Sequence, residues 1–124
     1  LIISRSLVRT QVSPPKTYIM IHYPTGSPNG TSFHGVTIDA TPEEMVEVLG
    51  DPSYLNGDKT NIEWVRELDS ADVFTVYDWK NYNGIEMDEV VHWHIGGRNE
   101  WVTIEAKKEI SHLLNEIRKN NTYA

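Results

Sequence analysis

The chain has 124 residues, with 18 acidic and 11 basic side chains and a net charge of −7. This length allows one domain built around a single hydrophobic core, because typical domains run about 100–150 residues. The sequence contains no cysteine, which excludes a disulfide scaffold and thiol chemistry. We expect no membrane span, because none of the apolar runs approaches about 18 residues.

The first 20 residues differ from the others in charge. They hold three basic residues and no acid, whereas the remaining 104 hold 8 basic and 18 acidic side chains and carry −10. We predict a basic arm over residues 1–17 and a single domain over residues 18–124. An alternative is that the arm is not native coding sequence and that translation starts at Met20, because Ser4–Pro15 resembles a translated tRNA 3′ end. The acidic domain would repel phosphates, so we expect no direct binding of nucleic acid.

Two strands are predicted before the first helix. The apolar run Tyr18–Ile21 has the length of a strand, and residues 24–30 are rich in Pro, Gly, Ser and Asn, which is typical of a loop. The segment Thr31–Asp39 then has the apolar pattern of a strand, and Gly35 within it predicts a bulge.

The first helix has the clearest local signal in the chain. Thr41 offers an N-cap hydroxyl, Pro42 suits the first helical position, and Glu44 at the third position completes a capping box. Apolar residues follow on one side, and Gly50 provides a stop. The sequence therefore predicts a short helix between Thr41 and Gly50.

Three strands with short connections are predicted next. They are Ile62–Leu68, Val73–Trp79 and Val90–Ile95, all rich in β-branched and aromatic residues. Residues 69–72 form a tight link between the first two. Such an order is typical of an antiparallel meander.

A long helix is predicted to end the domain, from Asn99 as the cap through about Glu100–Lys119. Its apolar stripe has three- and four-residue spacing and comprises Val102, Ala106, Ile110, Leu113, Leu114 and Ile117. This stripe has nothing to pack on except the sheet. The predicted fold is therefore α+β, an antiparallel meander with two helices packed on one face.

Several motifs resemble those of a widespread group of small phage proteins that has no established activity. They are the Thr-Pro-Glu-Glu helix start at 41–44, Glu-Trp-Val at 63–65, Val-Tyr-Asp-Trp-Lys at 76–80 and Trp-His-Ile-Gly-Gly at 93–97. The resemblance implies phage origin, a shared fold and action in the cytoplasm of an infected or lysogenic bacterial host. A looser similarity, at the level of fold only, is to small lipoprotein and β-lactamase-inhibitor-type repeats, which bind proteins.

His92 and His94 are a candidate metal-binding pair. They lie two residues apart on a predicted strand, so both side chains point to the same face. Zinc takes three or four nitrogen, oxygen or sulfur ligands, and the candidates for a third ligand are His34, Glu63, Glu67 and Asp78. The alternative is that both histidines are polar residues on a solvated sheet face.

The aromatic content is high for so small a domain. Trp64, Tyr77, Trp79 and Trp93 are expected to share one sheet face. Under the helices they are core, whereas on an uncovered face they form a stacking platform or a dimer interface. A site for a nucleotide requires one of the basic residues Arg66, Lys80 and Arg98 beside a Trp or Tyr in a pocket.

The segment Gly96–Asn99 joins the last strand to the last helix and has two interpretations. Its backbone amides, together with Arg98 and the helix dipole, suit a bound anion. The alternative is a simple strand-to-helix turn in which the glycines supply positive φ angles.

These features favour a binding module over an enzyme. The hypothesis is a homo-oligomeric phage or mobile-element protein that counters host defence, by sequestering a small anionic ligand of nucleotide type or by blocking a host protein. One alternative is a metal-dependent enzyme that uses His92 and His94. Another is a virion or assembly component.

Overall fold

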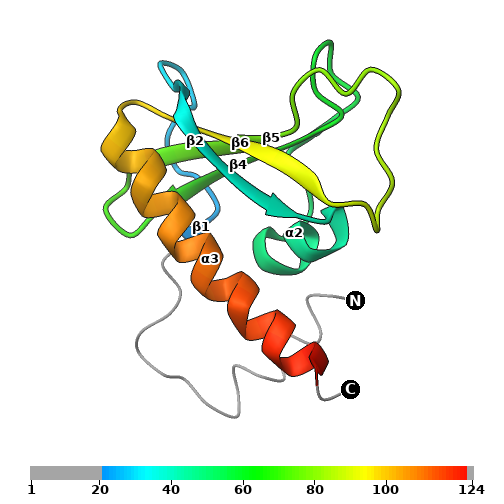
Figure 1. The fold of residues 1–124 in the computed structure, drawn as a ribbon. Coiled ribbons are helices and arrows are strands. Elements are labelled where there is room, and N and C mark those ends of the chain that lie inside the picture. The colour runs from blue at the N-terminus through cyan, green and yellow to red at the C-terminus, as the bar shows by residue number, and fades with distance from the viewer. Residues whose placement is uncertain (1–20, 123–124) are drawn as a thin grey trace.

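The computed structural model describes residues 21–122, so the predicted basic arm and Met20 lie outside the described residues. In this part of the chain one antiparallel sheet forms the upper layer of Figure 1, and both helices lie on the same side of it. The predicted α+β fold, with a meander and two helices on one face, is confirmed.

The sheet contains six strands in the order β1-β4-β5-β6-β2, with β3 paired to β4 beside this path. Their bounds are β1 Ile21–His22, β2 Ser32–Ala40, β3 Tyr54–Leu55, β4 Ile62–Leu68, β5 Val73–Tyr77 and β6 Val91–Gly97. Strands β4, β5 and β6 are neighbours in chain order, as a meander requires. The bounds of β4 equal the predicted ones, whereas β5 ends two residues early and β6 continues through both glycines.

Strand β2 lies at the edge of the sheet and pairs with β6. The register shifts between Phe33 and Thr37, and Gly35 has φ 89°. The register shift confirms the bulge predicted at Gly35. Glycine suits this position because a β-branched or bulky residue is strained at such an angle. An edge strand with a bulge is also less open to pairing with other chains.

Helix α2, Pro42–Leu49, begins as predicted. The Glu44 amide donates to the Thr41 hydroxyl at 3.1 Å, and the Glu44 carboxylate accepts from the Thr41 amide at 2.9 Å. Both partners of the capping box are therefore in place. At the other end Gly50 has φ 85°, and its amide donates to the Val46 carbonyl.

Helix α3, Glu100–Thr122, crosses under the sheet and packs mainly on β2 and β6. Asn99 caps it, because its side-chain oxygen accepts from the Val102 amide at 3.0 Å. Arg118 forms an ion pair with Glu44 at 2.7 Å, which ties this helix to the start of α2. That contact lowers the pKa of the Glu44 carboxyl. In the described part of the chain, neither helix is sufficiently long and apolar to span a bilayer.

The core lies between the sheet and the helices. Trp64 and Trp93 are fully buried there, and their rings meet edge to face with centroids 5.3 Å apart. Each indole N–H has a partner, since Trp64 donates to the Gly50 carbonyl and Trp93 to the Ala40 carbonyl. The Trp64 bond therefore links β4 to the C-terminal end of α2. The Trp93 bond links β6 to the end of β2, just before α2 begins.

Candidate functional site on the open sheet face

The candidate site lies on the sheet face that neither of the described helices, α2 and α3, covers. Strand register places Glu63 beside Tyr77 and Tyr77 beside His94, one residue from each of β4, β5 and β6. Successive side chains of a strand point to opposite faces, so these three face away from Trp64 and Trp93. All three side chains are half-buried. We call them the polar row.

Aromatic rings surround the His94 end of the polar row. His94 stacks on Phe33 with ring centroids 4.1 Å apart and lies nearly parallel to Trp79 at 6.2 Å. Tyr77 meets both the His94 and Trp79 rings edge to face. Phe33 and Trp79 are each 42 % exposed, so the cluster presents ring surface to solvent.

A buried carboxylate holds the loop that carries Trp79. Asp78 is fully buried and accepts hydrogen bonds from the backbone amides of Asn61 and Ile62 at 2.7 and 3.0 Å. Its second oxygen accepts from the side-chain amide of Asn61 at 2.8 Å. These bonds fix the end of β5 to the start of β4. The position of the Trp79 ring therefore depends on Asp78.

Two lysines lie over the Trp79 ring. The ammonium groups of Lys59 and Lys80 are 5.9 and 5.6 Å from its centroid. The Lys80 amide donates to the Lys59 carbonyl at 2.8 Å, which holds the two residues side by side. A cation over an aromatic face is attracted by the ring quadrupole, so positive charge gathers at this edge of an otherwise acidic domain.

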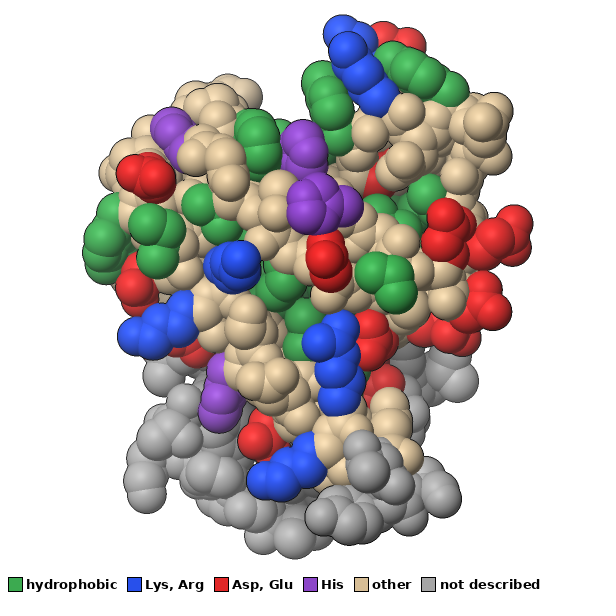
Figure 2. Space-filling view, in the orientation of Figure 1, with side chains coloured by type: hydrophobic (Ala, Val, Ile, Leu, Met, Phe, Trp, Pro, Cys, Tyr) green, Lys and Arg blue, Asp and Glu red, His purple; other side chains and the backbone are tan. Residues whose placement is uncertain are grey.

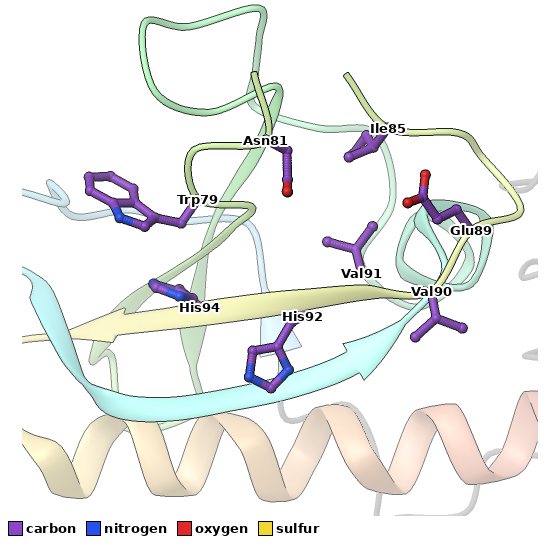
Figure 3. A pocket seen from close by; sticks show the side chains of 8 residues that line it. All are labelled: Trp79, Asn81, Ile85, Glu89, Val90, Val91, His92 and His94. Carbon is purple, nitrogen blue, oxygen red and sulfur yellow. The ribbon is translucent and has the colours of Figure 1, made fainter. Parts of the chain in front are cut away.

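A hollow of about 320 Å³ opens beside the aromatic rings. Its lining residues are Trp79, Asn81, Ile85, Glu89, Val90, Val91, His92 and His94. In Figure 3, Trp79 and His94 lie at one end, and Ile85 and Glu89 lie at the other. Figure 2 shows histidine side chains next to a notch in the surface of this region. The volume is at the lower end of the range for small-molecule sites, about 300–1,000 Å³.

Burial shifts all three groups of the polar row toward their uncharged forms. It raises the pKa of Glu63, and it raises the pKa of Tyr77 with a further contribution from the Glu63 charge. It lowers the pKa of His94, helped by the nearby His92. Perturbed groups gathered in one place are typical of functional sites.

The structure brings together four of the residues predicted from sequence, namely Tyr77, Trp79, Lys80 and His94. Lys80 beside Trp79 is one of the basic and aromatic pairs that a nucleotide site requires. Trp64 and Trp93 are in the core, however, so the expectation that they share a face with Tyr77 is wrong. The register pairs Tyr77 with Glu63 rather than with Trp64, and this places the two sets on opposite faces.

The two arginines predicted as candidates for a nucleotide site, Arg66 and Arg98, lie away from the Trp79 ring. Arg66 is buried on the helix side and donates to the Leu49 and Asp51 carbonyls at 2.9 and 2.7 Å. Tyr23 stacks on its guanidinium at 4.4 Å. Arg98 is exposed and bonds the Ser27 carbonyl. Neither arginine belongs to the open-face cluster.

Gly96 and Gly97 are strand residues without positive φ, so the turn interpretation is wrong. A side chain at Gly96 would approach the Thr75 hydroxyl to 2.5 Å, and one at Gly97 would press on Val102 and Thr103 of α3. Close packing therefore explains both glycines. The nearby helix amide of Val102 is already bonded to Asn99, which leaves the anion interpretation with little support.

Three of the four side chains considered as a third metal ligand serve other partners, and the fourth, Glu63, lies in the polar row beside Tyr77. His34 bonds the Gly97 carbonyl, Glu67 accepts from Thr25, and Asp78 holds Asn61. His92 pairs with Asp39 across the edge of the sheet. Within residues 21–122, no group of three or more His, Cys, Asp or Glu side chains is arranged to hold a metal ion.

Sequence reasoning missed several contributors to the site, and Phe33, Lys59 and Asn81 show the reason. Phe33 lies next to the bulge and reaches His94 only because β2 pairs with β6. Lys59 reaches Trp79 through the bond between its carbonyl and Lys80. Asn81 lines the hollow from the loop after β5. Each depends on pairing between distant segments, for which the local sequence carries no signal.

Comparison with family models, with curated proteins and with solved structures finds no match for this chain.

Proposed function

We propose that the protein is a binding module that sequesters a small ligand of nucleotide type on its open sheet face. One observation carries the proposal, the Trp79 ring with two lysine ammonium groups within 6 Å of it at the mouth of the hollow. A nucleotide combines a flat base with anionic phosphate. Base stacking on an aromatic side chain contributes about 1–3 kcal/mol, and lysine is a common phosphate-binding residue.

The surroundings favour a particular orientation of such a ligand. Val91 lines the hollow together with Trp79 and offers apolar surface to the edge of a base stacked on that ring. The carboxylate of Glu89 lies at the end away from Trp79 (Figure 3) and would repel a phosphate there. The phosphate is therefore expected at Lys59 and Lys80.

Tryptophan fluorescence tests this proposal. The chain has four tryptophans, of which Trp64 and Trp93 are fully buried and Trp79 and Trp101 are exposed. The substitution Trp101→Phe leaves Trp79 as the single exposed reporter. Titration with ribonucleoside 5′-monophosphates is expected to quench its emission with saturation, because a base stacked on the ring changes the environment of the indole.

Matched variants separate the site from general charge effects. Lys59→Ala and Lys80→Ala are each expected to weaken binding about five- to tenfold, which corresponds to about 1 kcal/mol for a solvent-exposed charge contact. Lys107→Ala removes an exposed lysine from α3 and is expected to change nothing. A titration without saturation for every nucleotide would contradict the proposal and would favour a protein partner.

A further inference from the structure

The polar row differs from the other polar groups that this fold withdraws from water. Arg66, Glu67 and Asp78 are buried, and each accepts or donates several hydrogen bonds within the chain. This is the rule in folded proteins, where more than about 90 % of buried polar groups have a partner. The row shows the opposite pattern.

The side chains of Glu63, Tyr77 and His94 have no hydrogen-bond partner among the described residues, although each is half-buried. No fully buried side-chain nitrogen or oxygen in this part of the chain lacks a partner. The polar atoms of the row therefore still reach the surface of the open face. They are three unused hydrogen-bonding groups at adjacent register positions.

We propose that Glu63, Tyr77 and His94 are the hydrogen-bonding part of the ligand site and recognise the hydroxyl groups of the ligand's ribose. This inference rests on the proposed function. A carboxyl group accepts hydrogen bonds, and a phenol or a neutral imidazole both donates and accepts. Hydroxyl groups have the same dual capacity, so the hydroxyl groups of a sugar suit side chains of this kind.

Position and charge both assign the sugar to this row. Tyr77 and His94 contact the Trp79 ring, so a ribose attached to a base stacked there lies within reach of both. Glu63 is the next residue along the row and offers no positive charge to a phosphate, so the phosphate is not expected at this end. Burial moves the pKa values of all three groups toward the neutral forms, which suits an uncharged diol.

The test compares ribonucleoside with 2′-deoxyribonucleoside 5′-monophosphates, in the Trp101→Phe background. The protein is expected to bind the ribose form at least about tenfold more tightly, because a site that hydrogen-bonds a hydroxyl rejects an analogue without it. In Tyr77→Phe and in Glu63→Ala, which each remove a hydrogen-bonding group of the row, the ratio is expected to fall toward one, with the deoxy affinity unchanged. Tyr82→Phe removes an exposed hydroxyl from the loop after β5 and is expected to keep the ratio.

Two other results would overturn the inference in distinguishable ways. Equal affinity for both sugars in the parent protein, or an equal loss for both in the variants, contradicts a role of the row in sugar recognition and leaves the nucleotide site standing. Failure of the parent protein to bind any nucleotide contradicts the proposed function and this inference together. The unfolding midpoint of each variant shows whether a loss comes from the site or from the fold.

Discussion

The two faces of the sheet use the same three strands, β4, β5 and β6, and treat polar groups in opposite ways. On the helix-covered face Trp64 and Trp93 are fully buried, and both indole N–H groups bond backbone carbonyls. On the open face the side chains of Glu63, Tyr77 and His94 are half-buried and have no hydrogen-bond partner within residues 21–122. The covered face completes its hydrogen bonds within the chain, whereas the open face keeps groups available for something else. This difference supports the ligand site proposed from the Trp79 ring and its two lysines.

The largest expected effect comes from the tryptophans of the two faces. Trp93→Ala is expected to lower the free energy of unfolding by about 3–5 kcal/mol, because it leaves a cavity in the core and removes the indole hydrogen bond to the Ala40 carbonyl. Trp79→Ala is expected to cost less than about 1 kcal/mol, because that ring is 42 % exposed. Urea unfolding of both variants measures the difference, and similar losses would contradict the assignment of the two faces.

The next largest expected loss of stability concerns Asp78, which holds the loop that carries Trp79. Asp78→Ala is expected to lower the free energy of unfolding by about 2–4 kcal/mol, because it leaves the buried amides of Asn61 and Ile62 without an acceptor. The exposed Asp58 provides the control, and Asp58→Ala is expected to change stability by less than about 0.5 kcal/mol. Equal, small losses in both variants would show that Asp78 does not hold the loop.

The smallest expected effect is a gain in stability, in contrast to the two losses above, and it depends on pH. Burial raises the pKa of Glu63, so the folded state binds this proton more tightly than the unfolded state does. The protonated Glu63 side chain is therefore tolerated without cost below its ordinary pKa of 4.5. As the pH rises through the pKa that Glu63 has in the folded state, the carboxyl ionises and the free energy of unfolding falls. Glu63→Gln is expected to stabilise the protein at pH 7 by less than about 1 kcal/mol, because the site is partly solvated, and to show no gain at pH 4.

Thermal unfolding at the two pH values tests this expectation. Glu86→Gln, at an exposed position in the loop after β5, is the control and is expected to show no such pH dependence. Destabilisation by Glu63→Gln at pH 7 would mean that the carboxylate has a stabilising partner, which contradicts the contrast between the faces.

The sequence predicted the local parts of this fold well. The capping box at Thr41 and Glu44, the cap at Asn99 and the bulge at Gly35 depend on residues close in the chain, and all are present. The two-residue strand β3, Tyr54–Leu55, was not predicted. It is too short to show a hydrophobic period and exists through its pairing with β4.

The candidate site was predicted only in part, because strand register decides which side chains of neighbouring strands share a face of the sheet. Trp64, Tyr77 and Trp93 all belong to apolar strands, and the local pattern does not tell which of them share a face. Pairing of Tyr77 with Glu63 and His94 decides it. The sequence named Glu63 only as a possible metal ligand, since its position in the polar row appears only after the strands are paired.

The measurement that tests the central claim most directly is the NMR spectrum of the four indole N–H groups during titration with a ribonucleoside 5′-monophosphate. Two indoles lie in the core, one lies on the outer side of α3, and Trp79 lies on the open face. The account predicts a saturable shift of the Trp79 signal, while the signals of Trp64, Trp93 and Trp101 stay in place. Saturable shifts at Trp101 with none at Trp79, or no shift at all, would contradict a ligand site on the open face.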